Sequence, residues 1–334
     1  MKVVITGGTG MVGKQLAFRL SAEGHDVTAL GRKAAVAAEL KEHGVYCALA
    51  HLEDAEAMSH AIAGNEVVYH CAALSTPWGD EKAFYQSNVV GTQNVIDACI
   101  EHGVKRLVYI STPSVYFNFK DRFGVKESDS LAEKPPSKYT ETKLEAERRV
   151  MDAKNQGLEV IVLRPRGIFG PEDQVLLPRL LKAIRQKRLP VMGNGKNRVD
   201  LTYIDNLVDA MALCLDVEPS ATGRIYNITN GEPVVLWDFI RSLVQELGIP
   251  YRPRSVPYSV MYGLAYAMEL KATYLTPSAE PVLTRYTVGL LSKSQTLDIE
   301  EAKSRLGYQP KVSMHQGMLR VAEAFRKRGD DLWN

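Results

Sequence analysis

The feature that most constrains this chain is the cluster of glycines that follows its first apolar run. The sequence begins MKVVITGGTGMVGKQLAF, where KVVIT has the character of a strand and Met11 to Glu23 has the apolar spacing of a helix. Gly7, Gly10 and Gly13 lie where the strand would pass directly into the helix. At such a junction the first glycine permits a tight turn, the second lets a pyrophosphate approach the backbone, and the third allows close helix packing.

This junction predicts a dinucleotide site at the start of the chain. The free amides of a helix N-terminus, here around Met11 and Val12, attract phosphate oxygens. The other interpretation is a glycine-rich turn without a ligand, and the flanking strand and helix disfavour it.

Apolar strands then alternate with helices along the first half of the chain. Helices are expected over 33–43, near 84–102 and over 137–155. The expected strands are KVVIT, DVTALG, VYCALA, EVVYHCAAL, RLVYIST and LEVIVLRP. Buried strands that alternate with helices indicate an α/β fold with a doubly wound, parallel sheet of the Rossmann type.

The rhythm breaks after Pro165, where proline becomes more frequent. The segments VDLTYIDNLVDAMALCL and RIYNIT resemble a return to the sheet. We therefore expect a dinucleotide-binding domain from residues 1–165 and 200–228. Residues 166–199 and 229–334 would form a smaller, mostly C-terminal α/β substrate domain over the ends of the strands.

Composition excludes several classes of protein. The net charge of +2 over 334 residues gives no reason to expect a nucleic-acid partner. Cys47, Cys71, Cys99 and Cys214 are scattered in apolar segments without metal-ligand spacing, so we expect reduced core cysteines and no metal site. VVI is too short for a signal-peptide core, and the chain is expected to be cytoplasmic.

The end of the second strand favours one dinucleotide over the other. NAD-binding folds usually place an acidic residue there to hold the ribose 2′-hydroxyl. Gly31 takes this place and is followed by Arg32 and Lys33, so no carboxylate remains to repel a 2′-phosphate, which a guanidinium can bind. NADP(H) is therefore predicted, with NAD(H) as the alternative; Arg32 and Lys33 can also be interpreted as a solvated helix start.

A catalytic pair follows in PPSKYTETKLEAE. Tyr139 and Lys143 are four residues apart and share one face of the expected helix. A nearby ammonium stabilises a phenolate and would lower the pKa of the tyrosine from about 10, which makes it a general acid/base. Thr112, at the end of a strand in ISTPSVYF, is placed to hydrogen-bond the reacting oxygen. A tyrosine and a lysine at this spacing are common and usually have no catalytic role. Their occurrence together with the N-terminal glycines is what indicates a catalytic pair.

The order of these motifs resembles that of the extended short-chain dehydrogenases/reductases. TGGTGMVG, HCAA, SNVVGTQNV, YISTPSVY, YTETK and RPRGIFGP occur in the order expected of that family, over essentially the whole chain. GNGKNRVDLTYIDNLVDAM and later segments are similar to the 3β-hydroxysteroid dehydrogenase branch, which includes sterol dehydrogenases and bacterial reductases of long-chain 2-alkyl-3-ketoacids.

The resemblance implies roles for individual residues. Tyr139 would donate the proton, Lys143 would be its partner and a ribose ligand, and Thr112, rather than the adjacent Ser111, would orient the substrate. The cofactor contacts implied beyond those already named are Leu52, Ala72, Ala73, Asn88, Ser111, Pro165 and Ile168. One position departs from the family pattern, because His51 stands where an aspartate often contacts adenine. His51 is included among the cofactor contacts, although a surface histidine is the commoner outcome.

The segment VPYSVMYGLAYAMEL indicates the kind of substrate. It runs from Val256 to Leu270, has no charge before Glu269, and is too short for the roughly 20 residues that cross a bilayer. One interpretation is a core helix of the smaller domain. The other is an apolar lid, with Met261, Tyr262, Leu264 and Tyr266 as its wall, that admits a lipid-like substrate and touches a membrane surface.

The leading prediction is thus an NADP(H)-dependent oxidoreductase that interconverts a ketone and a secondary alcohol on an apolar 3-keto or 3-hydroxy compound, acting as a homodimer. The first alternative is a nucleotide-sugar epimerase or dehydratase, for which Arg179 and Arg198 could bind phosphate. The second is a non-catalytic NADP-binding protein, which would commonly lack the tyrosine or the lysine.

Overall fold

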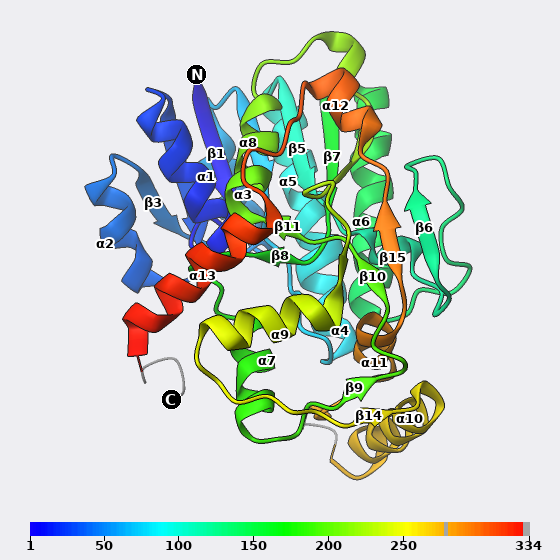
Figure 1. The fold of residues 1–334 in the computed structure, drawn as a ribbon. Coiled ribbons are helices and arrows are strands. Elements are labelled where there is room, and N and C mark those ends of the chain that lie inside the picture. Colours follow the sequence, from blue (N-terminus) through cyan, green and yellow to red (C-terminus); the bar gives the residue numbers. More distant parts are fainter. Residues whose placement is uncertain (277–279, 330–334) are drawn as a thin grey trace.

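The computed structural model describes residues 1–276 and 280–329, and a parallel seven-stranded sheet forms its centre (Figure 1). The strand order is β12-β7-β5-β4-β1-β2-β3, and each of these ladders is parallel. The strands are β1 (Lys2–Thr6), β2 (Asp26–Gly31), β3 (Tyr46–Leu49), β4 (Val67–His70), β5 (Arg106–Ile110), β7 (Glu159–Pro165) and β12 (Arg224–Ile228). The predicted α/β, Rossmann-type sheet is confirmed.

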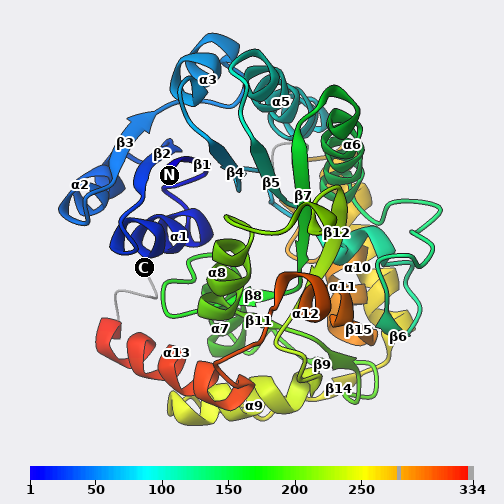
Figure 2. The ribbon, with the colours of Figure 1, turned by 90° about the horizontal axis from the view of Figure 1, so that it is seen from above.

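Helices cover both faces of this sheet (Figure 2). One face carries α3 (Ala55–Ile62), α5 (Gly91–Glu101) and α6 (Lys138–Ala153). The other carries α1 (Met11–Ala22) and α8 (Ile204–Leu213), which pack on each other, while α2 (Ala34–Glu42) lies near the β3 edge.

Alternation along the strands explains why both faces are apolar. Val4 of β1 belongs to the core beneath α3, α5 and α6, whereas its neighbours Val3 and Ile5 belong to the core on the opposite face. All three side chains are fully buried. A strand that is buried on both faces must be apolar at every position, which is what the continuous runs in the sequence indicated.

One expected helix is interrupted. Instead of a single helix near 84–102, the chain forms α4 (Glu81–Tyr85), a π-helical turn η1 (Gln86–Val90) and then α5. Such turns are often found at functional sites because the extra residue reorients the side chains around it. Here the turn contains Asn88.

Most of the remaining elements gather beyond the carboxyl ends of the central strands, whereas α12 (Glu300–Leu306) lies near their amino ends (Figure 1). A four-stranded sheet has the order β13-β10-β15-β6, and β8–β11 and β9–β14 form two-stranded sheets. These strands are β6 (Arg122–Val125), β8 (Ile168–Phe169), β9 (Val191–Met192), β10 (Arg198–Val199), β11 (Thr202–Tyr203), β13 (Val234–Val235), β14 (Ser255–Val256) and β15 (Gln295–Leu297). The helices are α7 (Leu176–Arg185), α9 (Leu236–Glu246), α10 (Tyr258–Tyr274), α11 (Arg285–Ser292), α12 (Glu300–Leu306) and α13 (Met314–Arg328), with short helical turns η2 (Pro113–Tyr116), η3 (Lys154–Gln156) and η4 (Pro219–Ala221).

Two elements cross between the regions. Strand β6, from the first half of the chain, pairs with β15 rather than with the central sheet, and α12 packs against β12. The division into residues 1–165 with 200–228 and 166–199 with 229–334 stays a prediction. Over residues 1–276 and 280–329, no helix is both long and apolar enough to cross a membrane.

Candidate active site

The glycine turn has no room for side chains. Gly7 has φ +71°, and a Cβ placed on it would lie 2.8 Å from the backbone nitrogen of Ala72. A Cβ on Gly13 would lie 2.5 Å from the carbonyl oxygen of Gly7. Helix α1 begins after Gly10 with no side-chain cap and no acidic residue in its first turn, so its first amides stay available to an anion.

A cavity of about 200 Å³ lies beside this turn, at the carboxyl ends of β1, β2, β3 and β4. The predicted cofactor residues that line it are Gly7, Gly10, Gly31, Arg32, Lys33, Leu52, Ala72 and Ala73. His51 is exposed and is not among the lining residues, although its neighbours Ala50, Leu52 and Glu53 are. The structure therefore gives no support for the predicted contact of His51, whose side chain lies at the surface.

Packing explains the missing acid at the end of β2. A Cβ on Gly31 would lie 2.1 Å from Oγ1 of Thr9, which also accepts a hydrogen bond from the backbone nitrogen of Arg32 at 3.3 Å. An aspartate therefore cannot replace Gly31 without displacing Thr9. No carboxylate stands at the end of β2, but Glu53, from the segment after β3, lines the same cavity.

A second cavity, of about 300 Å³, continues from the first and shares Cys71 and Ala73 with it. The predicted residues that line it are Val12, Ala73, Ser111, Thr112, Tyr139, Lys143, Pro165 and Ile168. Together the two cavities form a groove across the point where the strand order reverses, between β1 and β4. At its glycine end the groove has no room for side chains on the glycines, and at its other end it is lined by polar side chains. This arrangement fits a nicotinamide dinucleotide.

Three predicted cofactor residues, Met11, Gly13 and Asn88, do not line these cavities. Asn88 instead joins two segments of the site. Its Oδ1 accepts a hydrogen bond from the backbone nitrogen of Leu74 at 2.7 Å, and its Nδ2 donates to Oγ1 of Thr142 on α6 at 3.0 Å. The π-helical turn thus aims Asn88 at the segment that follows β4, and its role is to position the groove.

Helix α6 presents three polar residues at spacings of four. Ser137 caps its start by accepting a hydrogen bond from the backbone nitrogen of Thr140 at 3.2 Å. Tyr139, Lys143 and Glu147 follow on one face. The ammonium of Lys143 is buried, donates to the carbonyl oxygen of Ile110 at 2.6 Å, and lies 3.9 Å from the centre of the Tyr109 ring.

Burial governs the protonation of this pair. It raises the pKa of Tyr139 well above its ordinary value, with a hydrogen bond to Thr112 acting in the opposite direction. It lowers the pKa of Lys143 to about 7, against the attraction of Glu147. The prediction that Lys143 lowers the pKa of Tyr139 is therefore wrong for this state of the protein: Thr112 contacts the phenol, and the lysine carries the lowered pKa.

Glu147 and Arg164 form a buried ion pair behind the catalytic helix, and sequence reasoning missed it. The guanidinium donates to both carboxylate oxygens, with one distance of 2.9 Å, and also to the hydroxyl of Tyr116. Ser111 donates its hydroxyl proton to Glu147 at 2.5 Å, so it is turned away from the reacting centre. The hydroxyl next to Thr112 is instead that of Ser114, at 2.6 Å.

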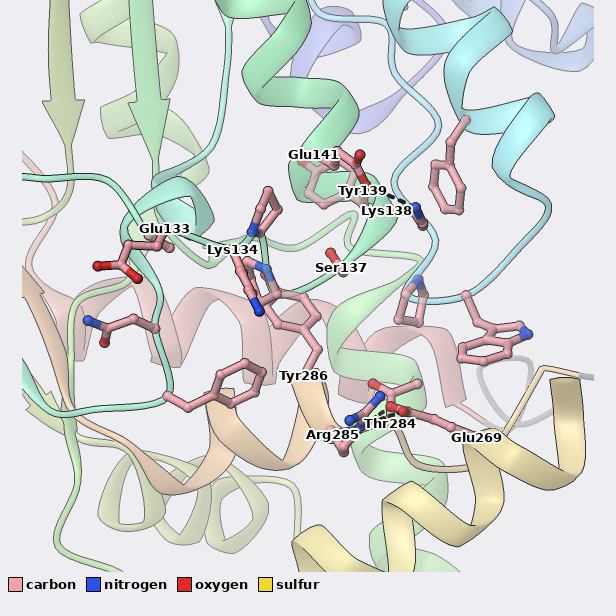
Figure 3. Close-up of a pocket in the computed structure, with 18 of the residues that line it drawn as sticks. Glu133, Lys134, Ser137, Lys138, Tyr139, Glu141, Glu269, Thr284, Arg285 and Tyr286 are labelled. Carbon is pink, nitrogen blue, oxygen red and sulfur yellow. Dashed lines mark hydrogen bonds and ion pairs between the residues drawn. The ribbon is translucent and has the colours of Figure 1, made fainter.

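A third cavity, of about 940 Å³, opens on the other side of Tyr139 (Figure 3). Tyr139 lines both this cavity and the groove, so it stands where the two meet. The large cavity is lined by 77–79, Glu81 and Phe84, by 118–120, 130–139 and Glu141, and by side chains of α10 and α11 that include Tyr262 and Tyr286. Phe119 in this wall has φ +63°, a strained conformation of the kind that clusters at binding sites.

The segment 256–270 is neither a core helix nor an apolar wall. In α10, Tyr262, Glu269 and Thr273 face the large cavity, whereas Met261 is buried in the core. Leu264 and Tyr266 are each 47% exposed and do not line the cavity. Residues seven or eleven apart share a helix face, and this face carries the polar members of the segment. The apolar residues that α10 exposes do not by themselves show contact with a membrane, so that contact stays a prediction. The homodimer also stays a prediction.

Comparisons with known proteins agree with this geometry. Residues 4–258 match the model of the 3-beta hydroxysteroid dehydrogenase/isomerase family. The chain is 37% identical to a 2-alkyl-3-oxoalkanoate reductase of Stenotrophomonas maltophilia, covering 96% of this chain and 98% of that protein. It is 31% identical to the mouse sterol-4-alpha-carboxylate 3-dehydrogenase, decarboxylating, covering 97% and 91%. The structure of UDP-glucuronic acid 4-epimerase from Bacillus cereus in complex with NAD shares the fold, with a TM-score of 0.76 at 23% identity and coverage of 98% and 99%.

Proposed function

The chain belongs to the 3-beta hydroxysteroid dehydrogenase/isomerase family, and we propose that it is an NADP(H)-dependent reductase of long-chain or ring-bearing 3-oxo acids. The coarser activity, an oxidoreductase acting on CH–OH and keto groups, follows from this membership. One observation carries the proposal: Tyr139 stands between the dinucleotide groove and a cavity of about 940 Å³.

In the proposed reaction a bound nicotinamide supplies or accepts the hydride. Tyr139 and Thr112, which line the same end of the groove, would both bind the substrate oxygen. In the reducing direction Tyr139 donates its proton to this oxygen. The negative charge of Glu147 raises the pKa of Lys143 and so, against the effect of burial, favours the protonated lysine. The Arg164 ion pair holds Glu147 in place.

The choice of NADP(H) rests on the mouth of the groove. Arg32 and Lys33 line the cavity beside the glycine turn. The side chain of Arg32 has no ion pair within residues 1–276 and 280–329, and Lys33 donates to Gln174 at 3.1 Å. A guanidinium without a carboxylate partner favours a 2′-phosphate, while Glu53 on the same wall opposes it.

The substrate class rests on the large cavity. Trp78, Phe84, Phe119 and Leu131 give it apolar surface, joined by Pro77, Pro135 and Pro136. Its charged side chains are largely neutralised. Lys138 pairs with Glu81 at 3.0 Å and with Glu141 at 3.1 Å, and Arg285 pairs with Glu269 at 2.5 Å. Lys120, Glu133 and Lys134 line the cavity without an ion pair in the described part of the chain, and the two lysines suit a single carboxylate at an apolar chain.

A sugar nucleotide is less well supported. Its diphosphate needs more unpaired cations than Lys120 and Lys134, which share the cavity wall with Glu133, because an unpaired buried charge is costly. Arg179, one candidate for that role, pairs with Glu280 at 3.1 Å, and neither it nor Arg198 lines the large cavity.

The test is a series of 2-alkyl-3-oxo acids of increasing chain length, assayed with NADPH beside UDP-glucose. We expect kcat/KM to rise along the series, by about 0.8 kcal/mol of binding for each buried methylene until the cavity is full. UDP-glucose should not turn over. A flat series together with turnover of UDP-glucose would support the epimerase instead.

A further inference from the structure

Helix α10 is apolar on its exposed face as well as on its buried one. Its exposed large apolar side chains are those of Val260, Leu264, Tyr266, Leu270 and Tyr274. Among the exposed positions of this helix, Lys271 is the one that carries a charge, whereas Glu269 is buried and paired with Arg285. A surface helix normally turns polar residues to water, so this outer face fits a surrounding that is itself apolar.

The exposed face of α10 belongs to a larger surface at one end of the molecule. Strand β14, which leads into α10, pairs in parallel with β9, which follows α7. Figure 1 shows α7, the β9–β14 pair and α10 together along the lower side of the molecule. We call residues 175–188 and 252–275 the α7–α10 surface. Two segments that are far apart in the sequence thus share one outer side of the protein.

The α7–α10 surface is strongly basic. It contains eight Lys or Arg residues and one acidic residue, Glu269, a net charge of +7, whereas the whole chain carries +2. The cations that are exposed and have no ion pair within residues 1–276 and 280–329 are Lys182, Lys187, Arg188, Arg252, Arg254 and Lys271. The rest of the chain is net negative, so positive charge is concentrated beside the apolar face of α10.

We propose that the α7–α10 surface docks on an anionic lipid bilayer. The apolar side chains of α10 enter the boundary between headgroups and acyl chains, as they do in helices that lie in the plane of a membrane surface. The cations of α7 and of the segment around β14 contact the negative headgroups. The two unusual features of this surface, its apolar helix face and its excess of positive charge, then have one explanation.

Charge decides between the bilayer and other occupants of an apolar face. In a symmetric contact between two copies of the chain the same surface meets itself, so two charges of +7 would face each other. A nucleic acid would match the charge but offers phosphates rather than apolar surface to Leu264 and Tyr274. An anionic bilayer supplies a partner for both the cations and the apolar side chains.

Helix α10 also separates this surface from the large cavity. Tyr262 and Thr273 line the cavity, while Val260 and Leu264 of the same helix are exposed on its outer side. A bilayer bound at α10 therefore lies one helix away from the site proposed for long-chain 3-oxo acids, whose apolar chains favour the bilayer over water. Only this consequence rests on the proposed function, and the docking itself does not.

The experiment is sedimentation of the full chain with vesicles of phosphatidylglycerol and phosphatidylcholine, beside vesicles of phosphatidylcholine alone. We expect binding to the mixed vesicles, at least about 10-fold weaker binding to phosphatidylcholine, and loss of binding as salt is raised. Val260→Gln with Leu264→Gln should weaken binding about 10-fold, because two apolar side chains no longer enter the bilayer. Lys187→Glu with Arg188→Glu should weaken it about 25-fold or more, at about five-fold for each cation.

Matched variants elsewhere on the molecule are the controls. Phe123→Gln removes an exposed aromatic side chain on β6. Lys41→Glu with Lys105→Glu makes the same change in net charge at exposed lysines outside the α7–α10 surface. Both controls should bind the mixed vesicles within about two-fold of the wild type. Every variant should keep the wild-type unfolding midpoint, because all the substituted side chains are exposed.

Three outcomes would contradict one proposal or the other. Failure of the wild type to bind the mixed vesicles, or wild-type binding by the Val260 and Leu264 variant, would overturn the docking. Conversion of an oligomer into a monomer by that variant without lipid, seen by sedimentation velocity, would also overturn it and show that the face is an interface between copies. Vesicle binding by a wild type that reduces no 3-oxo acid would instead overturn the proposed function and support the docking.

Discussion

The dinucleotide groove and the large cavity meet at Tyr139 but are built in opposite ways. The floor of the groove is formed by glycine backbone, and Gly7 and Gly13 have backbone atoms within 3 Å of where a Cβ would lie. The large cavity is walled by side chains from segments as distant as Trp78 and Tyr286. One site works because side chains are absent, and the other because they are present.

This difference teaches where each kind of specificity lies. A groove made of backbone can bind the part of a ligand that all members of a fold share, and it tolerates little change. A cavity made of side chains can be altered one wall at a time, which is how one fold accommodates many substrates. Substitutions on the two sides of Tyr139 should therefore have different consequences.

The largest effect is expected at the contact between the two regions. Tyr139→Phe removes the proton donor and should lower kcat about 10²–10⁴-fold while cofactor affinity and the unfolding midpoint stay near wild type. Thr112→Ala should cost less, because the phenol keeps its proton. Steady-state kinetics with a fluorescence titration of NADPH measures both. Near wild-type turnover in Tyr139→Phe would refute its role as the acid.

The same substitution should act in opposite directions on the two sides. Gly13→Ala places a methyl group 2.5 Å from the carbonyl oxygen of Gly7, so it should cost up to about 3 kcal/mol of stability and weaken cofactor binding. Gly263→Ala, in α10 with no atom within 4 Å of its added Cβ, should stabilise by about 0.5–1 kcal/mol. Urea unfolding of both variants measures the contrast. Equal effects would mean that the groove is not closed to side chains.

Cofactor choice tests the one part of the groove that does depend on a side chain. Arg32→Ala should weaken NADPH binding by about 1–3 kcal/mol and leave NADH binding unchanged, because only the 2′-phosphate loses a charged hydrogen bond. Lys134→Ala, in the large cavity, is the control and should change neither affinity. Equal wild-type affinities for NADPH and NADH, measured by titration, would contradict the preference for NADP(H).

The smallest effect concerns the stability of the protein. The pKa of Lys143 is lowered from 10.5 to about 7 by burial, so the unfolded chain binds more protons than the folded one between these values. Stability from this group therefore rises with pH across that window, and the burial cost is complete below pH 7. Lys143→Met, which has no charge to bury, should be more stable than wild type at pH 6 by at least about 1 kcal/mol, since one pKa unit corresponds to about 1.36 kcal/mol.

The advantage of Lys143→Met should shrink at pH 9, where the wild-type lysine is neutral in the folded protein. Urea unfolding of both proteins at the two pH values gives the difference directly, since all other titrating groups are common to them. A variant that is less stable than wild type at pH 6 would show that the lysine's contacts with Ile110 and Tyr109 outweigh its burial.

The sequence by itself determined the features that depend on neighbours along the chain. Continuous apolar runs identified the parallel strands, because a strand covered on both faces has no polar side. Glycines between β1 and α1 identified the groove, because only a missing Cβ allows that turn. The spacing of Tyr139 and Lys143 identified the catalytic face of α6, and the same spacing extended by four residues would have found Glu147.

Only the tertiary structure decided what depends on contacts between distant segments. Nothing in the sequence links Tyr286 of α11 to Tyr139 of α6, although both line the large cavity. Leu264 and Tyr266 were predicted to line the substrate cavity, and they do lie on α10, but on its exposed face. The packing of α10 on α11 determines which face of α10 is turned toward the cavity. The pKa of Lys143 likewise follows from burial, which local spacing does not reveal. Periodicity fixes the relative directions of side chains within one element, while their surroundings are set by long-range packing.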